Sequence, residues 1–96
     1  MSAYALVEVT VTNPEAMSEY RDKVPGTVEA HGGKYLVLSE TAKVLEGGLG
    51  EHPVKVVLEF PSMQAAQGWY DSPEYQAIIP NRMANSSGNF LLVDGV

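Results

Sequence analysis

Residues 59–83 read EFPSMQAAQGWYDSPEYQAIIPNRM, and this stretch decides the fold. Pro61 ends a strand because proline cannot donate to a strand ladder, and Ser62 after it can cap a helix. Residues 71–74, DSPE, give a second helix start. They supply a capping serine, a proline suited to the first helical position and an acid near the positive end of the helix dipole. The stretch therefore predicts a strand followed by two helical segments.

The second helical segment has one apolar face. Pro80 predicts that this segment is kinked or split. Arg82 lies inside the apolar stripe rather than opposite it. Because an unpaired buried charge is very costly, its guanidinium needs an acceptor or a path to water. The face consists of residues at i, i+3, i+4, i+7 and i+8, namely Tyr75, Ile78, Ile79, Arg82 and Met83.

Alternating apolar and polar residues predict the strands. In the second strand, Tyr35 and Val37 are predicted to lie on one face, opposite Leu36 and Leu38. Glycines and a proline predict a flexible hairpin connection before the third strand. The predicted strands cover residues 4–12, 34–39, 54–60 and 89–93, with residues 43–46 extending the second strand after a bulge and residues 47–53 forming the connection.

A helix is predicted between the first two strands. It starts at Asn13-Pro14-Glu15, which supplies a cap, a first-turn proline and a first-turn acid. Pro25 predicts a kink or a division into two short helices, and Gly32-Gly33 ends the helix. The apolar stripe of this helix is Met17, Tyr20, Val24 and Val28, continued by His31.

The element order β-α-β-β-α-β predicts a ferredoxin-like α+β fold in one domain, residues 1–96, with an antiparallel four-stranded sheet and helices on one of its faces. The face without helices still carries Tyr4, Leu6 and Val57. Since an exposed apolar sheet face favours a partner, we expect a homodimer that buries sheet against sheet.

Composition excludes several classes of function. The chain has 96 residues, is 45% hydrophobic and has a formal net charge of −6. An acidic chain without a basic cluster argues against nucleic acid and against anionic membranes as partners. It contains no cysteine, and its start, MSAYALVEVTVT, shows neither a signal peptide nor a membrane span, so a cytoplasmic protein is expected. His31 and His52 are too isolated to predict a metal site, and we expect no cofactor.

The chain contains the motifs VTVTNPE (9–15), YRDKVP (20–25), HGGKYLV (31–37), EFPS (59–62), WYDSPEY (69–75) and NR (81–82). Together these motifs resemble the domain of unknown function 1330 family over essentially the whole chain. The resemblance implies a dimeric α+β barrel, in which two ferredoxin-like sheets close into one barrel with the helices outside. The family has no settled activity, and its wider superfamily includes small oxygenases, isomerases, haem-handling enzymes and stress-induced proteins. This chain departs from the family pattern at His31, where tyrosine is common, and at Leu38-Ser39-Glu40, where a positive charge is missing.

Arg82 is the first candidate for a functional side chain, and three interpretations are open. Its guanidinium could clamp a substrate carboxylate in a bidentate manner. It could instead form an internal ion pair with Glu59 or Glu8, or reach solvent beyond the break at Pro80.

Aromatic residues form the second candidate group, Tyr20, Trp69, Tyr70 and Tyr75. These side chains could line a pocket whose hydroxyl groups orient a small ligand, or they could be ordinary core residues.

Two residues are candidates for proton transfer. His31 could act as a general base, or it could be a satisfied histidine at a helix C-terminus. Glu59 is the alternative proton carrier. The hypotheses are a cofactor-independent enzyme or binder for a small, partly aromatic carboxylate in the cleft between sheet and helices, or else a non-catalytic, stress-related or accessory dimer.

Overall fold

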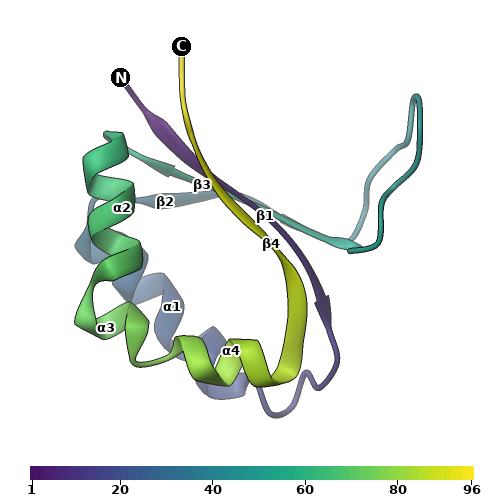
Figure 1. The fold of residues 1–96 in the computed structure, drawn as a ribbon, viewed down its shortest axis with the longest axis horizontal. Coiled ribbons are helices and arrows are strands. Elements are labelled where there is room, and N and C mark those ends of the chain that lie inside the picture. The colour runs from purple at the N-terminus through teal and green to yellow at the C-terminus, as the bar shows by residue number, and fades with distance from the viewer.

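The computed structural model describes all residues 1–96 and shows the predicted sheet, with every neighbouring pair of strands antiparallel and the strand order β2-β3-β1-β4 (Figure 1). The helices all lie on one face of this sheet (Figure 1). The ferredoxin-like α+β fold is therefore confirmed. The strands are β1 (Ala3–Val11), β2 (Lys34–Ser39), β3 (Val54–Phe60) and β4 (Ser86–Asp94), and the helices are α1 (Ser18–Ala30), α2 (Met63–Asp71), α3 (Pro73–Gln76) and α4 (Ile79–Asn85).

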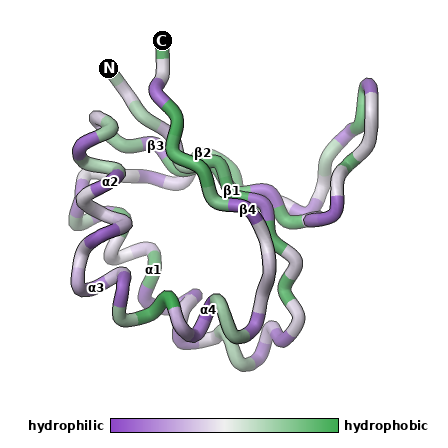
Figure 2. The backbone as a smooth tube through the Cα atoms, viewed as in Figure 1, coloured by the Kyte–Doolittle hydropathy of each residue, from purple (hydrophilic) through white to green (hydrophobic).

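The core lies between the sheet and the helices. Ala5 in the central strand β1 pairs with Leu58 of β3 and Leu92 of β4, so small and large side chains interlock on the helix-facing side. Alternation turns every second residue toward the helices, and the tube in Figure 2 is strongly hydrophobic along these central strands. The largest fully buried side chains are Trp69, Tyr75, Phe60 and Val28.

Strand β2 departs from the predicted alternation. Its register with β3 shifts between Tyr35 and Val37, which leaves Leu36 as an extra residue. Tyr35 then pairs with Leu58, and both Tyr35 and Leu38 line the space under the helices. The prediction that Tyr35 and Val37 share a face is wrong because the bulge reverses the alternation.

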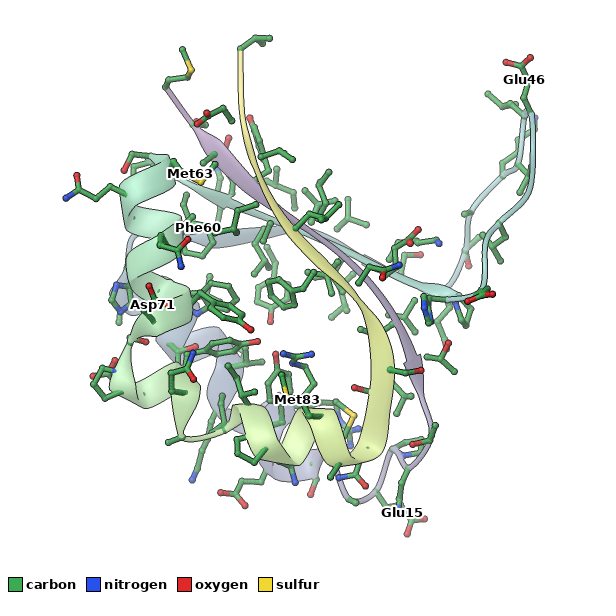
Figure 3. All side chains as sticks on the ribbon, viewed as in Figure 1. Glu15, Glu46, Phe60, Met63, Asp71 and Met83 are labelled. Carbon is green, nitrogen blue, oxygen red and sulfur yellow. The ribbon has the colours of Figure 1, made fainter.

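Residues 40–53 form a long arm that extends away from the body of the molecule (Figure 1). The prediction that residues 43–46 extend β2 is wrong, because β3 begins only at Val54 and offers them no strand to pair with. The base of the arm is held by Lys55, whose Nζ donates to the carbonyl oxygens of Leu49 (2.9 Å) and His52 (2.7 Å). Glu46 lies at its tip (Figure 3).

Helix α1 begins after a turn in which Asn13 Oδ1 accepts a hydrogen bond from the backbone N–H of Ala16 (3.1 Å). Val24 and Val28 of the predicted stripe are buried, whereas Met17 and His31 lie just outside the two ends of the helix. The helix runs through Pro25 as one element, so the predicted division into two helices does not occur. Gly32 adopts a φ of 76°, the left-handed conformation that ends helices.

Pro80 splits the last helical segment as predicted, with α3 before the break and α4 after it. Ser72 Oγ caps α3 by accepting from the N–H of Tyr75 (3.3 Å), and it donates to the carbonyl of Trp69 (2.7 Å). Because α4 has its own phase, Met83 leaves the predicted stripe and is 59% exposed. None of the helices has both the length and the apolar character needed to cross a bilayer.

Candidate functional site

A cavity of about 420 Å³ lies between α1 and the helix-facing side of the sheet. Strands β1, β2 and β3 supply its floor, α1 supplies one wall, and single residues of α2, α4 and β4 complete it. Its walls are mostly apolar, and they include Val7, Val9, Val24, Leu58, Trp69 and Phe90. Figure 3 shows side chains of the sheet and of the helices that point into the space between the two layers. A volume of this size suits a small organic molecule.

The titratable groups in the cavity wall are two tyrosines and two arginines, Tyr20, Tyr35, Arg21 and Arg82. They come from α1, β2 and α4, which are far apart in the sequence. The fold therefore gathers a few polar groups in an otherwise apolar space, which is the usual composition of a ligand site.

Arg82 projects from α4 into this cavity. Its guanidinium carbon lies 5.2 Å from the centre of the Phe90 ring, a cation–π distance. Its Nε atom is buried and has no hydrogen-bond partner. An unsatisfied charged donor in an apolar environment is costly, so a ligand acceptor at this point would remove the penalty.

An ion pair of Arg82 with Glu59 or Glu8, one of the three interpretations left open by the sequence, is not formed. Glu59 instead contacts Lys34 (3.4 Å) and accepts a hydrogen bond from Tyr4 (3.1 Å). Glu8 pairs with Lys55 at 2.7 Å. The reason is strand alternation, which turns both glutamates to the sheet face opposite the helices.

Tyr20 and Tyr75 join their hydroxyl groups beside Arg82. The two oxygens are 2.7 Å apart, and the rings meet edge to face. Burial raises the pKa of both tyrosines, and the Arg82 charge opposes this rise. Burial also raises the pKa of Tyr35 to about 12. The hydroxyl groups are therefore neutral at pH 7 and can donate hydrogen bonds to an anion.

Trp69 forms part of the cavity wall and anchors the aromatic core behind it. The indole Nε1–H donates to Thr27 Oγ1 (3.1 Å), and the ring lies 4.2 Å from that of Tyr75. Tyr70 packs on Phe90 with ring centres 5.5 Å apart. The four predicted aromatic residues thus gather in one cluster, in which Tyr20 and Trp69 line the cavity while Tyr70 and Tyr75 stand behind them.

The two predicted proton carriers lie away from the cavity. His31 is at the C-terminal end of α1, partly exposed, with Nε2 3.9 Å from Glu74. Glu59 is on the opposite face of the sheet. Neither belongs to the cavity wall, so the structure separates both from Arg82. No three histidine, aspartate or glutamate side chains gather in a way that could hold a metal ion.

Three aromatic or charged residues of the cavity wall were missed by the sequence analysis, Arg21, Tyr35 and Phe90. Tyr35 was missed because the bulge in β2 has no clear sequence signal. Phe90 was assigned only to a strand. Arg21 carried a usable signal, since it lies four residues after Met17 and three before Val24 on the apolar face of α1.

Comparison with known proteins gives a family and a fold. Residues 2–96 match the family described as Domain of unknown function (DUF1330). A solved protein of unknown function from Rhodopseudomonas palustris is 20% identical, with a TM-score of 0.78 over 99% of this chain and 82% of that one. SnoaB, a cofactor-independent oxygenase from Streptomyces nogalater, is 11% identical, with a TM-score of 0.66 over 99% of this chain and 93% of that one.

A dimeric ferredoxin-like protein of unknown function from Jannaschia sp. CCS1 is 14% identical, with a TM-score of 0.64 over 95% of this chain and 98% of that one. No curated protein matches the sequence. At these identities the solved structures are similar in fold alone.

Proposed function

The chain belongs to the domain of unknown function (DUF1330) family, and from this premise we propose that it binds a small, apolar, partly aromatic acid in the cavity between α1 and the sheet. The observation that carries the proposal is the state of Arg82. Its buried Nε has no acceptor, and its expected glutamate partners are bound to lysines. A ligand carboxylate is the group that best satisfies a guanidinium.

The remaining groups have supporting roles in this proposal. Tyr20 donates a second hydrogen bond to the oxyanion. Tyr75 orients the Tyr20 hydroxyl through the 2.7 Å contact between the two hydroxyl groups. Phe90 and Trp69 give the ligand body flat apolar surfaces, while Tyr70 supports Phe90 from behind. Burial of the ligand body supplies affinity, and the polar groups select an anion.

Binding is a better match to the geometry than acid–base catalysis by histidine or glutamate. The titratable groups on the wall are arginines and tyrosines with raised pKa, and these are poor bases at neutral pH. His31 and Glu59 would have to act from outside the cavity. We therefore leave both out of the proposed site.

We also propose that two chains associate through the sheet face that no helix covers. Figure 1 shows this face open, and it exposes Leu6 (38%), Val37 (39%) and Leu91 (57%). An apolar surface on adjacent strands favours association, and a two-fold pairing would let the same face meet itself. This pairing would leave the cavity on the far side of the sheet, between the sheet and the helices.

The ligand proposal is tested by thermal unfolding with benzoate and with benzamide, its neutral counterpart. We expect benzoate to raise the melting temperature of the wild type by mass action, and benzamide to have little effect. In Arg82→Met, which keeps the apolar volume but removes the charge, the benzoate shift should disappear because a charge-assisted hydrogen bond of about 1.5–3 kcal/mol is lost.

Lys23→Met is the matched control. It removes one positive charge from an exposed position on α1 that pairs with Glu19, so its benzoate shift should equal that of the wild type. The proposal fails if benzoate and benzamide act alike, or if Arg82→Met keeps the full shift. Strong destabilisation by Arg82→Met without ligand would indicate a structural role for the arginine instead.

A further inference from the structure

Arg21 and Arg82 are the only arginines in the sequence, and both line the same cavity. They come from α1 and α4, so the fold brings them together from distant parts of the chain. Their burial differs, because Arg21 is exposed whereas the Nε of Arg82 is out of contact with solvent. Arg21 is thus the more solvent-exposed of the two arginines in the cavity wall.

The lysines and the arginines of this chain differ in whether they pair with carboxylates. Three of the four lysines pair with glutamates, at 2.9 Å for Lys23, 3.4 Å for Lys34 and 2.7 Å for Lys55. Neither arginine pairs with a carboxylate, although acidic residues outnumber basic ones by twelve to six. Both guanidinium groups therefore have no carboxylate partner within the chain, and both line the cavity.

Arg21 is held in place without losing its charge. Its Nη1 donates to the carbonyl oxygen of Pro14 at 2.6 Å, in the turn that precedes α1. A carbonyl accepts one of the five N–H donors and leaves the others for a ligand. The rest of the cavity wall is mostly apolar, with Met17, Val24 and Phe90 among its residues.

Resting on the proposed function, we infer that the ligand carries two oxyanions separated by an apolar body, and that Arg21 binds the outer one. A monocarboxylate would satisfy Arg82 alone. A dicarboxylate with a flat aromatic body would satisfy both arginines and fill the apolar space between them. Arg21 is thus a specificity-determining residue, which selects diacids over monoacids of the same shape.

Titration calorimetry with benzoate, terephthalate and a naphthalene dicarboxylate tests this inference. We expect at least one of the two diacids to bind the wild type about threefold to tenfold more tightly than benzoate, as suits a charged contact near solvent. Arg21→Gln should abolish the difference, because it should weaken diacid binding more than it weakens benzoate binding. Lys23→Gln, on the same helix, should retain the difference. Added salt should reduce the diacid advantage more than it reduces benzoate binding.

The outcomes separate this inference from the proposal on which it rests. If benzoate binds through Arg82 but neither diacid binds better, the second oxyanion is disproved and the proposed function stands. Survival of the diacid advantage in Arg21→Gln also overturns the role of Arg21. If none of the three acids binds the wild type, the proposed function fails and this inference fails with it.

Discussion

Arg82 illustrates how one residue can be stable in a fold and still be poised for a ligand. Its position on α4 places a cation over the Phe90 ring at 5.2 Å, which offsets part of the cost of burial. The neighbouring hydroxyl groups of Tyr20 and Tyr75 present dipoles to the same charge. These contacts still leave Nε without an acceptor, so the fold offsets only part of the cost of burying the Arg82 charge.

The buried tyrosines predict a loss of stability at alkaline pH. In the unfolded chain tyrosine ionises near pH 10, whereas burial raises the pKa of Tyr20 and Tyr75, and that of Tyr35 to about 12. Above about pH 10 the unfolded state therefore holds fewer protons than the folded state, and the free energy of unfolding falls as pH rises.

Urea unfolding at intervals from about pH 8 to 11 measures this slope. Tyr75→Phe should make the alkaline decline less steep, since one buried phenol is removed. Tyr4→Phe removes a phenol from the opposite face of the sheet and serves as the control. A decline that is equally steep in Tyr75→Phe and in the wild type would contradict the explanation.

At the scale of elements, irregularities rather than regular structure shape the cavity. The bulge at Leu36 turns Tyr35 and Leu38 toward the helices. The break before Pro80 ends α3 and lets α4 approach the sheet with its own phase, which brings Arg82 inward and Met83 outward. A continuous strand and a continuous helix would have placed these side chains elsewhere.

Substitution of alanine for two glycines, Gly68 and Gly33, should have opposite effects on the free energy of unfolding. Gly68 lies inside α2, and a Cβ added there would meet nothing within 4 Å. Since glycine is a poor helix former, Gly68→Ala should raise the free energy of unfolding by about 0.5–1 kcal/mol. Gly33 joins α1 to β2, and a Cβ there would lie 2.5 Å from the Phe60 ring and 2.8 Å from Val28.

Gly33→Ala should therefore lower the free energy of unfolding by about 1–3 kcal/mol, as overpacking does in a full core. Urea unfolding of both variants beside the wild type checks the pair. The two substitutions add the same methyl group, so each is the other's control. Equal effects would show that local packing is not the deciding factor.

At the scale of the whole molecule, the helices cover one face of the sheet and leave the other open (Figure 1). The open face holds exposed leucine and valine side chains together with the Lys55–Glu8 and Lys34–Glu59 pairs. Such a mixed surface suits a specific pairing of two chains, because apolar contact supplies the affinity and the charges fix the orientation.

The proposed pairing predicts that substitutions of two exposed apolar residues, Leu91 and Met83, have different effects on the dimer. Leu91, 57% exposed, is on the open sheet face, and Met83, 59% exposed, is on the helical side. Leu91→Lys should shift the mass measured by light scattering from a dimer to a monomer, and Met83→Lys should leave a dimer. The melting temperature of the wild type should rise with protein concentration, as it does for obligate dimers.

A wild-type chain that is already monomeric would disprove the pairing. A dimer that survives Leu91→Lys but is lost in Met83→Lys would move the interface to the helical side.

The amount that could be predicted from sequence differs between fold and site. The caps at Ser62 and Ser72 and the break at Pro80 are local signals and were correct, and strand alternation was correct except in β2. The face that Tyr35 presents was not predictable, because a bulge depends on pairing with another strand. The sequence also could not predict whether Arg82 pairs with a glutamate, since this depends on which glutamates lie on the same side of the sheet as Arg82.

The sequence by itself determined the α+β architecture, the helix caps at Ser62 and Ser72, and the family. These follow from periodicity, capping residues and motifs, which act over a few neighbouring residues. Only the tertiary structure decided that Arg21, Tyr35 and Arg82 line one cavity and that Glu59 and His31 do not. The physical reason is that strand register and helix phase, set by contacts between distant segments, choose the side of the sheet on which each side chain lies.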